Sequence, residues 1–372
     1  MVWPLLDGKL RFRSVRALSG HLAARCRCLP SGCRSPRMSQ PESTSDVQVR
    51  AAALLQKVEA LREQIHAQIL GQDALVDDLM VALLAGGHVL LEGLPGLGKT
   101  MLVKALADGL GLDYSRVQFT PDLMPTDVTG TQVLDEDGSR RTFRFQRGPI
   151  FAGLVLADEI NRATPKTQAA LLEAMQERSV TVAGTTHELP APFHVIATQN
   201  PIELEGTFPL PEAQLDRFLF RLDVRTPGGE DMARILAATT GASAATPVAQ
   251  LTGQEMAQLQ ALVREVLCGS HLVRYVAELI VATHPDRPDS DEETRRLVRY
   301  GASARAGQAV LLGAKARALL AARPAVARED IDACLLPALR HRVLLGFEAD
   351  AEQVQVEDLL SGWRDRAQRA AR

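Results

Sequence analysis

Residues 93–100 read GLPGLGKT, a segment that matches the pattern G-x-x-x-x-G-K-[ST] at every fixed position. The apolar run HVLLEG leads into it, and apolar residues at helical spacing begin at Lys99. Glycines let backbone N–H groups turn toward a phosphate, and the amino end of the following helix adds partial positive charge. Lys99 is therefore expected to reach the β- and γ-phosphates of a nucleotide, and Thr100 to offer its hydroxyl to Mg²⁺. A chance glycine turn would not explain the position of this segment between a strand and a helix.

Strand-like runs follow the glycine-rich segment, and helical patterns separate most of them. They lie at residues 115–120, 153–159, 193–199 and 218–224. Strands that alternate with helices predict a mostly parallel sheet of five strands with helices on both faces. Residues 130–151 and 179–192 interrupt the alternation and are predicted to form hairpins, because polar and apolar residues alternate around a turn. After residue 226 the strand signals stop, and the pattern predicts only helices.

Two carboxylates end the run LVLADE, at the carboxyl end of a strand, where ligands bind in open α/β sheets. Asp158 is predicted to hold Mg²⁺, directly or through water. Glu159 is predicted to orient and activate an attacking water. Such a pair alone is a weak signal, and it gains meaning downstream of the phosphate motif. The pair also disfavours a small-molecule kinase, which has less need of a water-activating acid.

Two more residues are candidates for catalysis. Asn200 ends the run VIATQN and could hold the attacking water or contact the γ-phosphate, although its Asn-Pro pair, taken alone, is better explained by a turn. Arg217 stands just before the last strand, in LPEAQLDRF. It is either a surface arginine paired with Asp216 or an arginine finger offered to a neighbouring subunit, and spacing alone does not choose.

In this order, the motifs make the chain similar to the MoxR-type AAA+ ATPases over roughly residues 50–360. The segments that carry the resemblance are GHVLLEGLPGLGKT, QFTPDLMPTDVTG, FRFQRGPIF, LADEINRATPKTQAALLEAMQER, ATQNPIELEGTFPLPEAQLDRF and GASARA. The resemblance implies an α/β fold, namely a P-loop AAA+ αβα core with a five-stranded mostly parallel sheet, followed by an all-α lid domain. It also implies ATP and Mg²⁺ as cofactors, and ATP hydrolysis at the subunit interfaces of a ring, usually a homo-hexamer.

The resemblance assigns roles to single residues. Asp158 and Glu159 match Walker B, Asn200 matches sensor 1, Arg217 the arginine finger and Arg305 sensor 2. Nucleotide contacts are implied for Gln72, at the adenine, and for Gly93, Leu94, Pro95, Gly96, Leu97, Gly98, Lys99, Thr100 and Met101. Metal ligation falls to Thr100 and Asp158. Gln118 is a candidate for the glutamate switch, and Arg162 is a second arginine that could reach the interface.

Arg305 lies in GASARA, where the family usually has proline in place of Ala304. The small residues are expected to let a lid helix begin close to the nucleotide, so that Arg305 meets the γ-phosphate from the domain opposite the P-loop. Proline would rigidify this approach, and Ala304 is expected to loosen it.

Charge is unevenly distributed along the chain. Residues 1–37 carry eight Lys and Arg against one acid, whereas residues 38–372 have a net charge of −10. The acidic body and an aromatic content of 4% argue against a nucleic-acid surface. We expect four parts: a basic extension or over-extended start (1–45), the nucleotide-binding core (46–225), the helical lid (226–360) and a tail (361–372).

The resemblance implies a chaperone-like motor whose ATP turnover remodels a partner protein, helping it mature or take up a metal or cofactor. Such partners commonly carry a von Willebrand factor A domain. A magnesium-chelatase-like motor subunit is the closest alternative. A DNA-acting or transcription-activating ATPase is a more distant one, and the absence of a GAFTGA-like loop from the sequence argues against it. Because no apolar run is long enough to span a bilayer and no disulfide framework is evident, a cytoplasmic protein without membrane insertion is predicted.

Overall fold

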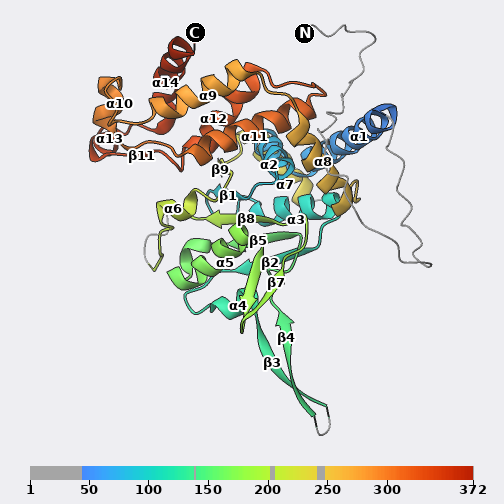
Figure 1. Ribbon diagram of the computed structural model, residues 1–372. Helices are drawn as coiled ribbons and strands as arrows, with labels where there is room; N and C mark the ends of the chain where they lie inside the picture. Colours follow the sequence, from blue (N-terminus) through green and yellow to red (C-terminus); the bar gives the residue numbers. More distant parts are fainter. Residues whose placement is uncertain (1–43, 138–139, 202–205, 241–247, 372) are drawn as a thin grey trace, which may run out of the picture.

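A parallel sheet lies at the centre of the computed structural model, which describes residues 44–137, 140–201, 206–240 and 248–371 (Figure 1). The five strands have the order β2-β5-β8-β1-β9, and every neighbouring pair is parallel. The strands are β1 (Val89–Glu92), β2 (Tyr114–Gln118), β5 (Leu154–Asp158), β8 (His194–Gln199) and β9 (Phe220–Asp223). The predicted five-stranded sheet is therefore confirmed, and it is wholly parallel.

Successive residues of each strand point to opposite faces of the sheet and enter two different cores. Val89 and Leu91 of β1 belong to one core, and Leu90 between them belongs to the other. Helices α1, α2 and α3 cover the first core, and α4 and α5 cover the second. The helices of this part are α1 (Thr44–Gln68), α2 (Asp73–Leu84), α3 (Lys99–Leu110), α4 (Pro125–Thr129), the 3₁₀ turn η1 (Ile160–Arg162), α5 (Pro165–Glu177) and α6 (Glu212–Leu215).

The chain beyond β9 is built mainly from helices, and α9 to α14 gather on one side of the core (Figure 1). These helices are α7 (Gly229–Thr240), α8 (Gly253–Glu265), α9 (Ser270–Ala282), α10 (Glu292–Leu297), α11 (Ala304–Leu320), α12 (Arg328–Leu339), α13 (Phe347–Glu352) and α14 (Val356–Ala370). The expectation of helices alone differs in one detail, because β10 (Val298–Tyr300) pairs with β11 (Leu344–Leu345). Strands this short do not produce the alternating pattern by which strands are recognised in a sequence.

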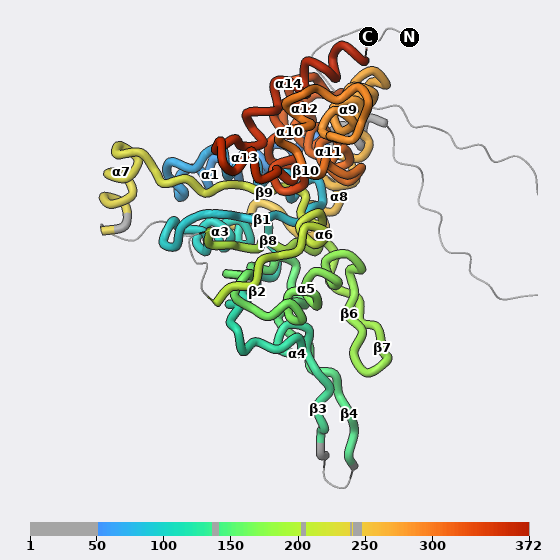
Figure 2. The backbone as a smooth tube through the Cα atoms, turned by 90° about the vertical axis from the view of Figure 1, so that its left-hand side faces the viewer, coloured from blue at the N-terminus to red at the C-terminus, as the bar shows by residue number. Residues whose placement is uncertain are grey.

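Two β-hairpins project from the core on the side away from the C-terminal helices (Figure 2). The longer hairpin pairs β3 (Gly130–Asp137) with β4 (Arg140–Arg147), and the shorter pairs β6 (Ser179–Val182) with β7 (Thr185–Glu188). The ring of Phe145 stacks on that of His187, with centroids 3.9 Å apart. Both predicted hairpins are therefore present, and this stacked pair joins them.

A buried ion pair ties the C-terminal helices to the core. Arg342, which follows α12, has a side chain only 3% exposed, and its Nε donates to Asp216 Oδ1 at 2.6 Å. Its other guanidinium nitrogens donate to the carbonyl oxygens of Phe218 and Leu219. These contacts fix the segment between α6 and β9 against the end of α12.

Candidate active site

The glycine-rich loop lies between β1 and α3, at the carboxyl edge of the sheet. Gly96 and Gly98 have φ of 83° and 74°, in the left-handed region that glycine adopts most readily. A Cβ on either glycine would meet nothing within 4 Å, so backbone conformation, not crowding, requires glycine there. No side chain caps α3, and its first N–H groups can therefore face a ligand.

Side chains from several elements meet in a cavity of about 440 Å³ beside this loop. The lining residues are Pro95, Gly96, Gly98, Lys99, Thr100, Met101, Arg116, Asp158, Glu159 and Asn200. Lys99 Nζ donates to the carbonyl oxygen of Gly93 at 2.6 Å. Gly93, Leu94 and Leu97, also predicted to contact a nucleotide, are not among the lining residues; Leu97 packs against the core instead.

Thr198 of β8 holds both carboxylate-bearing residues of the cavity. Its hydroxyl donates to Asp158 Oδ1 at 2.6 Å and accepts a hydrogen bond from the backbone N–H of Glu159 at 2.8 Å. Glu159 has φ of 56°, a left-handed conformation that turns the chain sharply after β5. Asp158 is buried, whereas the side chain of Glu159 is partly exposed to the cavity.

Strand β2 contributes two polar side chains, one of which sequence reasoning missed. Gln118 Nε2 donates to Glu159 Oε2 at 2.8 Å, so the candidate glutamate switch contacts the candidate base. Arg116, which was not predicted, donates to Asp158 Oδ2 from Nε at 3.1 Å and from Nη2 at 2.7 Å. Spacing places Arg116 on the same face of β2 as Gln118, but its contact with Asp158 depends on the register between β2 and β5.

Two remaining candidates lie at the same carboxyl edge. Asn200 follows β8 and is buried, and its carbonyl oxygen accepts a hydrogen bond from Asn161 Nδ2 at 3.5 Å. Arg162, at the end of η1, donates from Nη1 to Glu159 Oε2 at 3.1 Å. Arg162 therefore contacts the carboxylate of its own subunit.

These residues fit a magnesium–nucleotide complex by the chemistry of their donors. The Thr100 hydroxyl and the Asp158 carboxylate are oxygen donors of the kind that Mg²⁺ prefers, and Lys99 with the loop N–H groups suits phosphate oxygens. Within the described ranges, no group of three or more His, Cys, Asp or Glu side chains could hold a metal by itself. A cation bound by few protein ligands and by phosphates matches this donor set.

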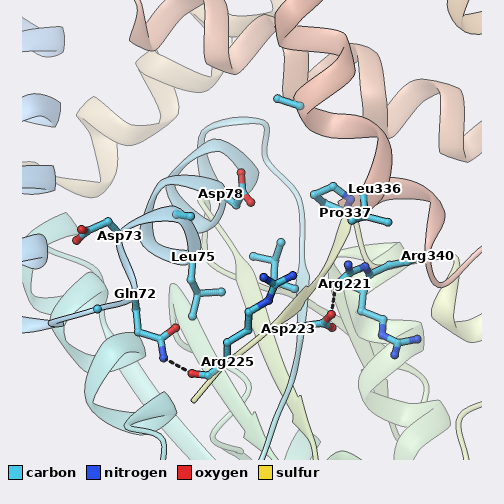
Figure 3. A pocket seen from close by; sticks show the side chains of 14 residues that line it. Gln72, Asp73, Leu75, Asp78, Arg221, Asp223, Arg225, Leu336, Pro337 and Arg340 are labelled. Carbon is cyan, nitrogen blue, oxygen red and sulfur yellow. Dashed lines mark hydrogen bonds and ion pairs between the residues drawn. The ribbon is translucent and has the colours of Figure 1, made fainter. Parts of the chain in front are cut away.

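Gln72 lines a second hollow of about 380 Å³ at the same edge of the sheet (Figure 3). Its Nε2 donates to the carbonyl oxygen of Arg225 at 2.8 Å, and Leu336 and Pro337 of α12 stand on the opposite side. The hollow adjoins the glycine-rich loop, because β9 and β1 are paired and end together here.

Arg217 and Arg305 lie at the opposite edge of the sheet. Together they line a hollow of about 270 Å³ that also includes His88, the residue just before β1. Arg217 Nε is buried without a hydrogen-bond partner among the described residues. Arg305 is half exposed, with Nη1 3.9 Å from Asp216 Oδ2. We call this the arginine hollow, because Arg178, Arg217, Arg305 and Arg342 line it with Asp216 as its carboxylate.

The structure corrects the expected position of Arg305 beside its own P-loop. Ser303, which caps α11, donates to Asp216 Oδ2 at 3.1 Å, and this contact places the start of α11 at the amino edge. A strand advances about 3.3 Å per residue, so β1 separates the two edges by about 13 Å. Arg178, at the C-cap of α5, was missed because only the fold brings it to this hollow.

The described part of the chain contains fourteen α-helices of different length and polarity. None of its helices combines the length and the apolar character that a bilayer span requires.

Known proteins resemble this chain over most of its length. The family model described as "ATPase family associated with various cellular activities (AAA)" matches residues 88–220, and the model described as "AAA lid domain" matches residues 291–362. Chaperone MoxR1 of Mycobacterium tuberculosis is 40% identical, over 83% of this chain and 81% of that protein. Protein MoxR of Paracoccus denitrificans is 35% identical, over 76% of this chain and 86% of that protein. A crystal structure from Cytophaga hutchinsonii, described only provisionally as an ATPase, has a TM-score of 0.81 at 34% identity and covers 87% of this chain and 97% of its own.

Proposed function

Because this chain belongs to the MoxR-type AAA+ ATPase family, we propose that it binds ATP with Mg²⁺ and hydrolyses it to ADP and phosphate. The observation that carries the proposal is the single cavity lined by Lys99, Thr100, Asp158, Glu159 and Asn200. Their side chains offer a phosphate-binding cation, oxygen ligands for a metal, a base and a neutral amide. Each of these groups can assist the hydrolysis of a phosphoanhydride by water.

Each residue would have a separate part in the reaction. Lys99 and the N–H groups of the loop would bind the β- and γ-phosphates, while Thr100 and Asp158 would hold Mg²⁺, which neutralises phosphate charge when bound. Glu159 would accept a proton from the attacking water, and Asn200 would orient that water. The buried Thr198 would keep Asp158 and Glu159 in place through its two hydrogen bonds.

The hollow beside Gln72 is our proposal for the site of the adenine. Leu75, Leu336 and Pro337 supply apolar walls, and the hollow adjoins the loop that would bind the phosphates. Its position between α2 and α12 would let the base contact both the core and the C-terminal helices (Figure 3).

The arginine hollow supports catalysis between subunits of a ring. Arg217 and Arg305 lie at the edge of the sheet opposite to the P-loop, so they suit the γ-phosphate of a neighbouring subunit better than that of their own. Because the buried Arg342 is paired with Asp216, the positive charge that a triphosphate requires would come from Arg178, Arg217 and Arg305. We propose a homo-oligomeric ring, a hexamer as is usual in the family.

The use of this ATP turnover is proposed from the family. The chain would act as a chaperone-like motor in the cytoplasm that remodels or matures a partner protein, for metal or cofactor insertion in some cases. The relative from Mycobacterium tuberculosis is itself named a chaperone. A partner with a von Willebrand factor A domain is the expected client.

The proposal is tested with purified full-length protein. Wild type should hydrolyse ATP only with Mg²⁺, and Glu159→Gln should bind ATP but turn over at least about 100-fold more slowly, because general-base catalysis contributes 10²–10⁴-fold. Glu63→Gln is a matched control, because Glu63 is exposed on α1 away from the cavity. Proteins that co-purify with the Glu159→Gln trap, identified by mass spectrometry, would name the client. Wild type without Mg²⁺-dependent hydrolysis under any ring-promoting condition would contradict the proposal.

A further inference from the structure

We propose that Arg116 is a positioning residue that couples Mg²⁺ binding at Asp158 to the release of Glu159. The inference rests on the proposed ATP hydrolysis, and it concerns a residue that belongs to none of the recognised motifs. It follows from contacts made by β2 at the edge of the cavity.

A continuous chain of hydrogen bonds joins the two carboxylates. Arg116 donates to Asp158 Oδ2 from Nε at 3.1 Å and from Nη2 at 2.7 Å. The same Nη2 donates to Gln118 Oε1 at 3.0 Å. Gln118 Nε2 in turn donates to Glu159 Oε2 at 2.8 Å. Arg116 and Gln118 thus connect the metal-binding carboxylate to the base.

Strand geometry explains why these two residues act together. Arg116 and Gln118 are two residues apart and lie on one face of β2, and Gln118 is the register partner of Asp158 in β5. Because β2 is an edge strand, no further strand among the described residues covers this side of the sheet. The Arg116 side chain is 48% exposed and that of Asp158 only 11%. Arg116 therefore has room to move, whereas Asp158 is fixed.

Arg116 and Mg²⁺ would compete for the same oxygen. Asp158 Oδ1 is bonded to Thr198 at 2.6 Å, which leaves Oδ2, bonded to Arg116, as the oxygen available to the cavity. A guanidinium next to a divalent cation is repelled, so Arg116 would give up Asp158 when the metal is bound. When Arg116 leaves Asp158, its hydrogen bond to Gln118 would weaken as well. The hydrogen bond from Gln118 to Glu159 would then weaken in turn.

The test measures how much free Mg²⁺ gives half-maximal binding of a fluorescent ADP analogue to the full chain. Arg116→Gln should lower this concentration by about 1.5- to fivefold, the range expected for a partly exposed ion pair. Gln118→Leu should also lower it, although Gln118 does not contact Asp158, because Gln118 helps to hold Arg116 in place. The double variant should shift it no further than Arg116→Gln alone.

Further variants separate geometry from charge. Arg116→Lys keeps the charge but lacks the planar guanidinium that donates to Asp158 and Gln118 at once. Its Mg²⁺ midpoint should therefore lie between those of wild type and Arg116→Gln. Arg287→Gln removes an arginine that is also 48% exposed and pairs with Asp289; it lines neither the cavity nor the hollow beside Gln72, and should leave the midpoint unchanged. Circular dichroism and thermal unfolding would check that every variant is folded.

Several outcomes would overturn the inference. An unchanged midpoint in folded Arg116→Gln would show that Arg116 does not compete with the metal. An unchanged midpoint in Gln118→Leu, or additive shifts in the double variant, would remove the coupling. A wild-type midpoint in Arg116→Lys would assign the effect to charge and not to position. If wild type did not bind the analogue at saturating Mg²⁺, the proposed function would fail as well, which distinguishes the two failures.

Discussion

At the scale of single residues, the candidate site depends on groups that do not touch the expected substrate. The hydroxyl of Thr198 is both a donor to Asp158 and an acceptor from the backbone of Glu159. One side chain on β8 therefore sets the direction of two residues that end β5. Outer contacts of this kind determine how well metal-binding carboxylates are oriented.

Thr198→Val removes this hydroxyl and nearly preserves the shape of the side chain. We expect the kcat of ATP hydrolysis to fall by about 10- to 100-fold, with a smaller change in KM, as is typical when outer contacts of a metal site are lost. Steady-state ATPase assays would measure this, with Thr181→Val on the exposed face of β6 as the matched control. Wild-type turnover in a folded Thr198→Val protein would show that these hydrogen bonds do not position the carboxylates.

Sequence reasoning selected residues of the cavity where a motif fixes their local geometry. Lys99 and Thr100 belong to one loop and helix start, and Asp158 and Glu159 lie at the end of one strand. Local sequence patterns are therefore enough to identify each pair as candidate site residues. Arg116 escaped notice because its contact with Asp158 depends on the register between β2 and β5. Such a register is set by the whole sheet and cannot be deduced from the spacing of residues within one strand.

At the scale of elements, helix α11 shows how closely the C-terminal helices pack against the sheet. A Cβ on Gly313 would lie 2.6 Å from Phe220 Cζ in β9 and 2.9 Å from Cys334 Sγ in α12. Real side chains do not approach so closely, so glycine is required where α11 crosses these two elements. Its φ is not unusual, and the constraint is therefore one of space alone.

Gly313→Ala should lower the free energy of unfolding by about 1–3 kcal/mol, the usual cost of adding a methyl group to a tightly packed core. The matched variant is Gly362→Ala in α14, where an added Cβ would meet nothing within 4 Å. That change should raise the free energy of unfolding by about 0.5–1 kcal/mol, because alanine favours helix over glycine. Urea denaturation of both variants would measure the two effects, and stabilisation by Gly313→Ala would contradict the packing argument.

At the scale of the whole molecule, buried histidines link stability to pH. Burial lowers the pKa of His88 to about 3 and that of His194 to about 4, and it also lowers the pKa of His341. The folded protein therefore keeps these rings neutral below pH 6.5, the ordinary histidine value, while the unfolded chain takes up protons. Since the unfolded state then binds more protons, the protein loses stability as the pH falls.

The expected loss is about 1.4 kcal/mol per pH unit for each histidine between pH 6.5 and its folded pKa. Asp78 opposes this loss below about pH 6, because burial raises its pKa to about 6 and the folded state then takes up a proton before the unfolded chain does. Urea denaturation between pH 7.5 and 5 would measure the net dependence. Equal stability across this range would show that the rings are not held neutral. His187→Gln serves as a control, because His187 is not buried in the core.

The order of the elements predicted the sheet and the helical C-terminal region, but not how that region meets the core. Local patterns define strands and helices, whereas the position of α11 depends on contacts between distant segments. Asp216 receives Arg342 and Ser303 from two places more than 80 residues further along the chain. These contacts place Arg305 at the amino edge of the sheet, which no spacing within GASARA could have indicated.

The placement of the P-loop and the arginine hollow at opposite edges leads to a prediction about mixed rings. Glu159→Gln keeps Arg217 and Arg305 but lacks the candidate base, and Arg217→Ala keeps the whole P-loop cavity but lacks the candidate finger. Each variant alone should be inactive if the arginines serve the neighbouring subunit. In a ring assembled from equal amounts of both, about a quarter of the interfaces would join an intact cavity to an intact Arg217.

Mixing the two variants under exchange conditions should therefore restore ATPase activity to about a quarter of the wild-type rate per subunit, if interfaces work independently. Each variant mixed with Lys99→Ala provides the control. Glu159→Gln with Lys99→Ala should stay inactive because neither has a working cavity, whereas Arg217→Ala with Lys99→Ala should recover because Lys99→Ala retains its arginines. If Arg217 acted within its own subunit, no mixture would exceed the sum of its parts, since no active site would be complete. Activity is thus expected in the two mixtures that contain Arg217→Ala and not in the mixture of Glu159→Gln with Lys99→Ala. This result would assign Arg217 to the neighbour's nucleotide, independently of whether the ring is a hexamer.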